Sequence, residues 1–218
     1  MSPMPENPKI YHITHVNNLE GILECGGLLS DARMIREGGS AQAVGMSKIK
    51  RRRLEEIEVT CHPGTKVGEY VPFYYCPRSV MLYILHRSNH QEVGYTGGQE
   101  PIIHLEADLN SAIEWAKDSG TKWALSFSNA GAYLVEFGCN QSDFHRLDWS
   151  AIFATDFRES DIKERKQAEF LVHGFFPFEL VSRIGVYSNR IHDKVTQTLL
   201  RHGRFTGLEV RVMRGWYY

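Results

Sequence analysis

Residues 168–173 read Ala-Glu-Phe-Leu-Val-His, an alternating run that predicts a β-strand. Alternation places Ala168, Phe170 and Val172 on one face and Glu169 beside Leu171 on the other. An ionised carboxylate in such apolar company costs free energy unless a partner meets it. Glu169 therefore either belongs to a functional site or lies on an edge strand with its carboxylate in water, and the pattern alone slightly favours the second interpretation.

Arg53 is the second charged residue that the pattern places facing inward. The spacing predicts a helix over 47–57, in which Met46, Ile49, Arg53 and Ile57 fall within one face at about 100° per residue. A guanidinium on an apolar face should meet an anion, either a carboxylate or the phosphate of a ligand. The spacing is equally compatible with a side chain whose stem packs while its head reaches solvent.

The rest of the chain divides into short elements. Strands are predicted at 10–14, 70–75, 102–105, 122–127, 132–137, 184–187 and 209–213, and helices at 77–86, 108–120, 162–166 and 192–201. Asn17 should cap a further helix that Gly26 and Gly27 end, and residues 30–46 should be irregular. Because strands and helices do not alternate regularly, we expect an α+β fold in one domain, 1–218. The poorly periodic stretch 128–160 is typical of a functional loop.

Composition excludes several classes of protein. The chain has 218 residues, and none of its apolar runs approaches the roughly 20 residues that span a bilayer. Residues 1–8 are polar and unlike a signal peptide, so we expect a cytoplasmic protein without membrane association. The formal net charge of -1 does not indicate a nucleic-acid binder, so any such contact must come from a local patch such as the basic run 48–53.

The sequence also gives no indication of a metal site. The four cysteines form no C-x-x-C pair, and we expect them to be reduced thiols. They are Cys25, Cys61, Cys76 and Cys139. His12 and His15 stand three residues apart on a predicted strand, where their rings face opposite sides and do not converge on one ion. We therefore expect no metal.

The aromatic stretch 70–75 is best interpreted as a core strand. Tyr74 and the nearby Arg78 are the polar exceptions, and they could offer stacking surfaces to a nucleic-acid base.

Taken together, several segments resemble the DarT family of DNA ADP-ribosyltransferase toxins, and the resemblance covers nearly the whole chain. The segments that carry it are 10–15 (IYHITH), 18–23 (NLEGIL), 49–53 (IKRRR), 70–74 (YVPFY), 76–79 (CPRS), 81–83 (MLY), 97–102 (GGQEPI), 166–172 (KQAEFLV) and the terminal 216–218 (WYY). The resemblance implies an ADP-ribosyltransferase fold, with two small β-sheets flanked by helices around an NAD cleft.

The resemblance also implies roles for individual residues. Glu169 and Arg53 match the catalytic glutamate and arginine of the family, with Arg52 as a competitor for the second position. Five further positions, together with Arg53, match NAD+ contacts. They are His12, Ile13, Thr14, Gly21 and Leu29. Residues 34–53 would form a lid over NAD+, and the stretch before Glu169 would be the substrate-recognition loop.

By this likeness the activity is that of a toxin which transfers ADP-ribose from NAD+ to N3 of thymine in single-stranded DNA, in a sequence-dependent manner and without a metal. Its partner would be the macrodomain antitoxin DarG. Two alternatives remain: an NAD+-dependent transferase acting on guanine, RNA or protein, and a non-catalytic nucleic-acid-binding module that uses the basic run 48–53. The inward placement of Arg53 and Glu169 argues against the second alternative, because a module that only binds needs neither residue.

Overall fold

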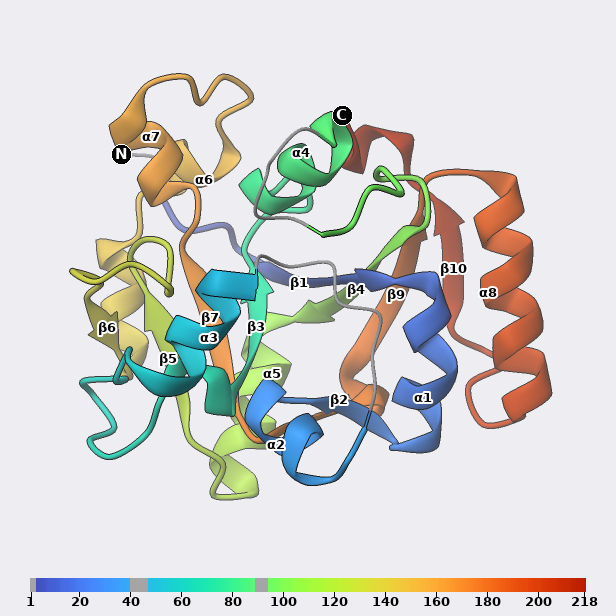
Figure 1. Cartoon of the computed structure of the whole chain (residues 1–218), viewed down its shortest axis with the longest axis horizontal. Coiled ribbons are helices and arrows are strands. Elements are labelled where there is room, and N and C mark those ends of the chain that lie inside the picture. The colour runs from blue at the N-terminus through green and yellow to red at the C-terminus, as the bar shows by residue number, and fades with distance from the viewer. Residues whose placement is uncertain (1–2, 40–46, 89–93) are drawn as a thin grey trace.

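A computed structural model describes residues 3–39, 47–88 and 94–218, and its centre is a mixed sheet (Figure 1). The eight strands of this sheet follow one another in the order β10-β9-β4-β1-β3-β7-β5-β6. Their bounds are Glu209–Val212 (β10), Val181–Val186 (β9), Ile102–Asp108 (β4), Lys9–His15 (β1), Tyr70–Tyr74 (β3), Glu169–His173 (β7), Trp123–Ser126 (β5) and Phe137–Gly138 (β6). A second sheet pairs β2 (Gly27–Leu29) with β8 (Phe175–Pro177).

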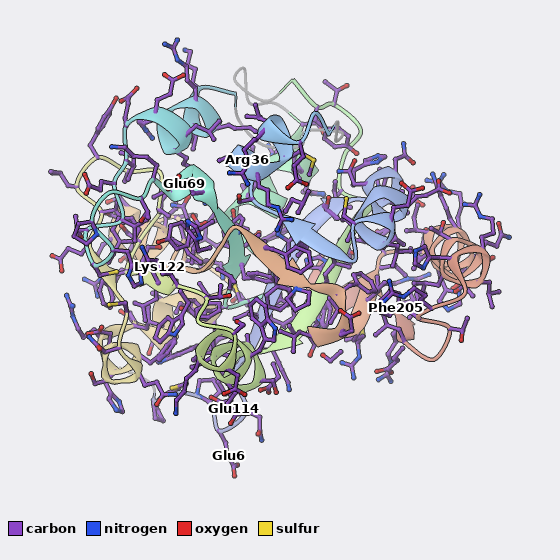
Figure 2. The ribbon with its side chains drawn as sticks, turned by 90° about the horizontal axis from the view of Figure 1, so that it is seen from below. Glu6, Arg36, Glu69, Glu114, Lys122 and Phe205 are labelled. Atoms are coloured by element: carbon purple, nitrogen blue, oxygen red, sulfur yellow. The ribbon has the colours of Figure 1, made fainter. Side chains whose placement is uncertain are left out.

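Eight helices flank the sheets within the described ranges. They are α1 (Leu19–Glu24), α2 (Asp31–Arg36), α3 (Ser47–Glu55), α4 (Val80–Arg87), α5 (Leu109–Asp118), α6 (Trp149–Phe153), α7 (Ser160–Arg165) and α8 (Asn189–His202). In Figure 1 the red β10 and the orange α8 lie at one end of the sheet, with α1 beside α8. Figure 2 views the molecule from below, where β2 and β8 lie between Glu114 of α5 and Arg36 of α2. No helix in the described ranges is long and apolar enough to cross a membrane.

The predicted α+β architecture, with two sheets flanked by helices, is confirmed. The two sheets are unequal in size, because most strands, including some that are far apart in sequence, pair with one another in the larger sheet. β1 pairs with β4 along its whole length, from Lys9 opposite Asp108 to His15 opposite Ile102. The sequence pattern gave no signal for β2 and β8, since runs of three residues are too short to display a period.

Four local predictions were wrong. Residues 30–46 are not wholly irregular, because Ser30 Oγ accepts a hydrogen bond from the Arg33 amide and begins α2; residues 40–46 of that stretch lie outside the described ranges. The helix predicted from residue 77 begins at Val80, capped by Ser79. The strand predicted at 132–137 is reduced to β6.

The fourth wrong prediction concerns the cap before α1. The His15 ring, rather than the Asn17 side chain, acts as the cap: it accepts a hydrogen bond from the backbone amide of Asn17. A short 3-10 turn, Val16–Asn18, then precedes the helix. A ring nitrogen as the capping acceptor is a choice that sequence rules for helix starts do not anticipate.

β7 passes through the middle of the hydrophobic core. Phe170 and Val172 belong to the main apolar cluster, which packs against helices on one face of the sheet. Leu171 points to the other face and joins a smaller cluster with Ile57, Val59 and Phe137, beneath the end of α3. The carboxylate of Glu169 therefore faces the side on which α3 lies, as the alternation of the sequence predicted.

Candidate active site

Glu169 is the first residue of an interior strand. β7 pairs with β3 on one side and with β5 on the other, and the residue is only 2% exposed. Its backbone amide donates to Ser126 Oγ at 3.0 Å, and that hydroxyl donates to the carbonyl oxygen of Ser128 at 2.7 Å. The interpretation of Glu169 as an edge-strand residue with its head in water is therefore wrong, because neighbouring strands cover both edges of β7.

Arg53 is the partner of this buried carboxylate. It belongs to α3, which lies in front of β7 in Figure 1, and it donates from Nη1 to Oε1 at 3.0 Å and from Nη2 to Oε2 at 2.9 Å. The amide of Ala130 donates a third hydrogen bond to Oε1, at 3.2 Å. The Arg53 side chain is only 14% exposed, and its guanidinium is bound to the buried carboxylate rather than extended into solvent. Two parallel hydrogen bonds between charged groups fix both the position and the plane of the carboxylate.

The charge of Glu169 acts on its neighbours. Burial alone would lower the pKa of the Arg53 guanidinium, but the charge of Glu169 and its hydrogen bonds raise that pKa, so the cation is retained. Tyr74 lies directly opposite Glu169 in the β3–β7 ladder. Burial, followed by the charge of Glu169, raises the pKa of the Tyr74 phenol, which stays protonated at neutral pH. The site thus offers one anion, one cation and one neutral hydroxyl.

Arg52, the competitor for the arginine position, points elsewhere. Its guanidinium carbon stacks 4.6 Å above the ring centre of Tyr133, in the loop before β6. Its Nε atom is buried and has no hydrogen-bond partner in the part of the chain that the structure describes. Geometry therefore favours Arg53 as the arginine that acts together with Glu169.

The loop between β5 and β6 presses against α3 at Gly131. A Cβ atom at this position would lie 2.8 Å from Ile49 Cγ2 and 3.6 Å from Arg53 Cγ. The amide of Gly131 donates to Asn129 Oδ1 at 2.8 Å, which fixes the turn. A glycine lets the loop approach the helix closely, and the same loop supplies the Ala130 amide to Glu169.

The predicted NAD+ contacts lie on β1, α1 and β2. His12 donates from Nδ1 to the carbonyl oxygen of Pro72 at 2.9 Å, and burial lowers its pKa, so the ring is neutral with Nε2 as an acceptor. Thr14 Oγ1 accepts from Asn18 at 3.0 Å. Ile13 lies between them and is half-buried. Gly21 lies on the exposed side of α1, and Leu29 pairs with Phe175 in the small sheet.

Arg78 lies in a different environment from Tyr74. It lines a cavity of about 110 Å³ together with Lys166, Phe153 and Tyr218. Its guanidinium carbon stacks 4.5 Å from the Tyr218 ring centre. Lys166, which is buried, donates from Nζ to the carbonyl oxygen of Ile152 at 2.7 Å. Two cations and two aromatic rings around one hollow suit an anionic ligand that carries a flat base.

Residues 11–218 match the family described as "ssDNA thymidine ADP-ribosyltransferase, DarT". The chain belongs to the DarT family. It is therefore an NAD-dependent DNA ADP-ribosyltransferase, and the resemblance noted from the sequence is confirmed.

Relatives of this DarT chain support the assignment. The DNA ADP-ribosyl transferase of Thermus aquaticus is 39% identical over 209 residues, which cover 96% of this chain and 88% of the relative. The solved structure of Thermus sp. 2.9 DarT in complex with ADP-ribosylated ssDNA has a TM-score of 0.89 at 33% identity, with 100% and 99% of the two chains covered. Thermus sp. 2.9 DarT in complex with NAD+ has a TM-score of 0.82 at 32% identity, with 99% and 100% covered.

Two features of this DarT site were missed by sequence reasoning. Asp31, at the start of α2, acts through its charge on His12, where it partly offsets the lowering of the pKa by burial, and on Arg53, where it adds to the effect of Glu169 that raises the pKa; it also pairs with Lys50 at 2.8 Å. Its signal was Ser30 in front of a helix-compatible run, which is a capping pattern. Lys166 is the second feature; its burial has no sequence signal, because a lysine next to a predicted strand ordinarily faces solvent.

Proposed function

We propose that this chain attaches ADP-ribose from NAD+ to N3 of thymine in single-stranded DNA, in a sequence-dependent manner, and releases nicotinamide. The observation that carries the proposal is the buried bidentate pair between Arg53 and Glu169. The family to which the chain belongs supplies the reaction class. The alternatives, transfer to guanine, RNA or protein and binding without catalysis, are distinguished by the experiment below.

The donor half of the reaction suits Glu169. When the bond between nicotinamide and ribose breaks, the electron pair leaves with nicotinamide and positive charge develops on the ribose. A carboxylate that is already oriented stabilises this charge without reorganising. Arg53 holds the carboxylate and supplies positive charge for the NAD+ pyrophosphate or for the incoming base. In the same proposal His12, Ile13, Thr14, Gly21 and Leu29 contact NAD+.

The acceptor half of the reaction needs an exposed base. Thymine N3 lies on the Watson–Crick edge, which pairing occupies in a duplex, so the base must be unpaired. We assign Tyr74 and Arg78 to substrate DNA. The cavity that Arg78 shares with Lys166 supports this assignment, since both cations suit the phosphate backbone. As N3 bonds to the ribose carbon, its proton leaves the base, and Glu169 is the candidate acceptor among the site residues.

The remaining assignments rest on the family. We propose that residues 1–218 form one ADP-ribosyltransferase domain, that the protein acts as a toxin in the cytoplasm without membrane association, and that a macrodomain antitoxin of the DarG type reverses the modification. The solved structure of Thermosipho africanus DarTG in complex with ADP-ribose has the same fold, with a TM-score of 0.74 at 19% identity.

The test is an adduct assay. The protein is incubated with NAD+ and single-stranded oligonucleotides that contain or lack thymine, and the products are analysed by mass spectrometry. We expect an ADP-ribose adduct only on the thymine-containing strand, and none when that thymine carries an N3-methyl group. Parallel reactions offer guanine-only strands, RNA and protein. A non-catalytic binder would release no nicotinamide from NAD+ in any of these reactions.

Matched variants connect the assay to the site. Glu169→Gln should abolish the adduct, whereas Glu114→Gln, on the exposed surface of α5 (Figure 2), should leave it unchanged. If Glu169→Gln retains full activity while folded, the proposed role of the pair is refuted. If the wild-type protein modifies guanine, RNA or protein instead, the assignment of transferase activity stands and the assignment of thymine as the acceptor is refuted.

A further inference from the structure

Three metal-ligating side chains meet away from the Arg53–Glu169 pair. Cys61, His62 and Cys139 each offer one ligand atom, and these atoms all lie within 4.8 Å of one another. Both cysteines are free thiols, and all three residues are half-buried. Cys61 and His62 belong to the loop that follows α3, whereas Cys139 directly follows β6, so the cluster joins segments that are 77 residues apart at their closest.

The type and spacing of these groups suit one cation. Two thiolates and an imidazole form a set that favours Zn²⁺ over hard cations such as Mg²⁺ or Ca²⁺. In a tetrahedral zinc site with Zn–S bonds of about 2.3 Å and Zn–N bonds of about 2.0 Å, ligand atoms lie about 3.4–3.8 Å apart. The distances within the cluster therefore have to shrink by at most about 1.4 Å around an ion, which rotation of half-buried side chains can supply.

The surroundings of His62 support the same interpretation. Its Nε2 atom lies 2.8 Å from the carbonyl oxygen of Trp123 on β5. A carbonyl oxygen only accepts, so Nε2 carries the proton and Nδ1 keeps a free lone pair. A histidine that donates one ring N–H to a backbone carbonyl while its other nitrogen binds the ion is the usual arrangement at metal sites. Asp143, which lies against Gly138 next to Cys139, is a further carboxylate beside the cluster.

We propose that Cys61, His62 and Cys139 bind one structural Zn²⁺, with water or the Asp143 carboxylate in the fourth position. The ion ties the loop after α3 to the end of β6. The small apolar cluster between these segments, which includes Ile57 and Phe137, lies beneath the end of α3. Zinc therefore braces the helix that carries Arg53. This inference is independent of the proposed acceptor base.

Metal titration of the whole chain tests the proposal. The reduced, chelator-treated protein is titrated with Co²⁺ and then with Zn²⁺, and absorption and bound metal are measured. We expect one ion per chain, a thiolate-to-Co²⁺ charge-transfer band that Zn²⁺ removes, and a higher thermal midpoint with Zn²⁺. Cys61→Ser and Cys139→Ser should each weaken binding by at least about 100-fold. Cys25→Ser, which alters an exposed thiol outside the cluster, should bind like wild type.

Three outcomes overturn the proposal. The first is the absence of a thiolate band and of stoichiometric metal in the reduced wild-type protein, a measurement that needs no variant to fold. The second is equal Co²⁺ affinity in Cys61→Ser and Cys25→Ser. A Cys61–Cys139 disulfide, found by peptide mapping in a protein that binds no metal after reduction, would identify the pair as a redox pair and refute the zinc site.

Discussion

Removal of Arg53 by Arg53→Ala should destabilise the fold in a strongly pH-dependent manner. The variant leaves the Glu169 carboxylate buried, with the Ala130 amide at 3.2 Å as its one remaining donor from the described contacts. Breaking a buried ion pair by deleting one partner costs about 3–5 kcal/mol. At pH 7 the carboxylate can avoid part of this loss by taking up a proton. Protonating an ordinary glutamate at that pH itself costs about 3.7 kcal/mol.

We therefore expect a loss of about 3 kcal/mol at pH 7, which lowers the thermal midpoint by roughly 6–12 °C in a chain of this size. At pH 5 the cost of protonation falls to about 1 kcal/mol, so the deficit relative to wild type should shrink to a similar value. Adding Glu169→Gln to Arg53→Ala removes the orphaned charge. The double variant should therefore be more stable at pH 7 than Arg53→Ala alone.

Urea unfolding at pH 5 and pH 7, followed by circular dichroism, measures each of these differences. Arg51→Ala is the matched control, because Arg51 is exposed on the same helix and its loss should leave the unfolding midpoint unchanged at both pH values. The reasoning fails if Arg53→Ala is equally destabilised at both pH values, or if Glu169→Gln brings no recovery. Either result would mean that the loss of stability does not come from an orphaned Glu169 charge.

Three further predictions concern other parts of the fold. Tyr74→Phe removes the neutral hydroxyl opposite Glu169 and should reduce adduct formation at least about tenfold without lowering the thermal midpoint. Gly131→Ala introduces a Cβ atom 2.8 Å from Ile49 and should cost about 1–3 kcal/mol in urea unfolding, with a parallel loss of activity as α3 shifts. Burial lowers the pKa of His104 to about 4. As the pH falls, the unfolded chain therefore binds a proton at this residue near pH 6.5, whereas the folded chain binds it only near pH 4. Stability should therefore fall as the pH drops from about 6.5 towards 4, and His104→Gln should flatten this slope by about one proton.

The sequence predicted those parts of the fold and the site that depend on local pattern. Alternation in 168–173 placed Glu169 on the correct face of its strand, and helical spacing placed Arg53 inward. Neither pattern determined the neighbours of β7, because strand order is a property of long-range pairing. The edge-strand interpretation of Glu169 was therefore wrong, although the face on which it lies was predicted correctly.

The same limit explains what the sequence did not predict. The cluster of Cys61, His62 and Cys139 has no C-x-x-C spacing. Its two halves meet because β6 pairs with β5 and because His62 donates to the carbonyl oxygen of Trp123 on β5. The burial of Lys166 could likewise not be predicted from the sequence, since its hydrogen-bond partner is a backbone carbonyl in α6. Residues whose roles depend on distant contacts cannot be recognised from a local pattern. Charged residues on the apolar face of a strand or helix can be recognised in this way.

The hydrogen bonds of Glu169 bear on whether the pair must open during the proposed reaction. An ionised carboxylate offers about four acceptor directions. Arg53 Nη1 and the Ala130 amide fill both acceptor directions on Oε1. Arg53 Nη2 fills one of the two directions on Oε2. One direction on Oε2 is thus left, for a ribose hydroxyl or for the proton of the incoming base. Glu169 can therefore hold the sugar while Arg53 remains bound, and the guanidinium does not have to leave before the charge on the ribose develops. In the proposed reaction the ion pair itself is the preorganised catalytic unit.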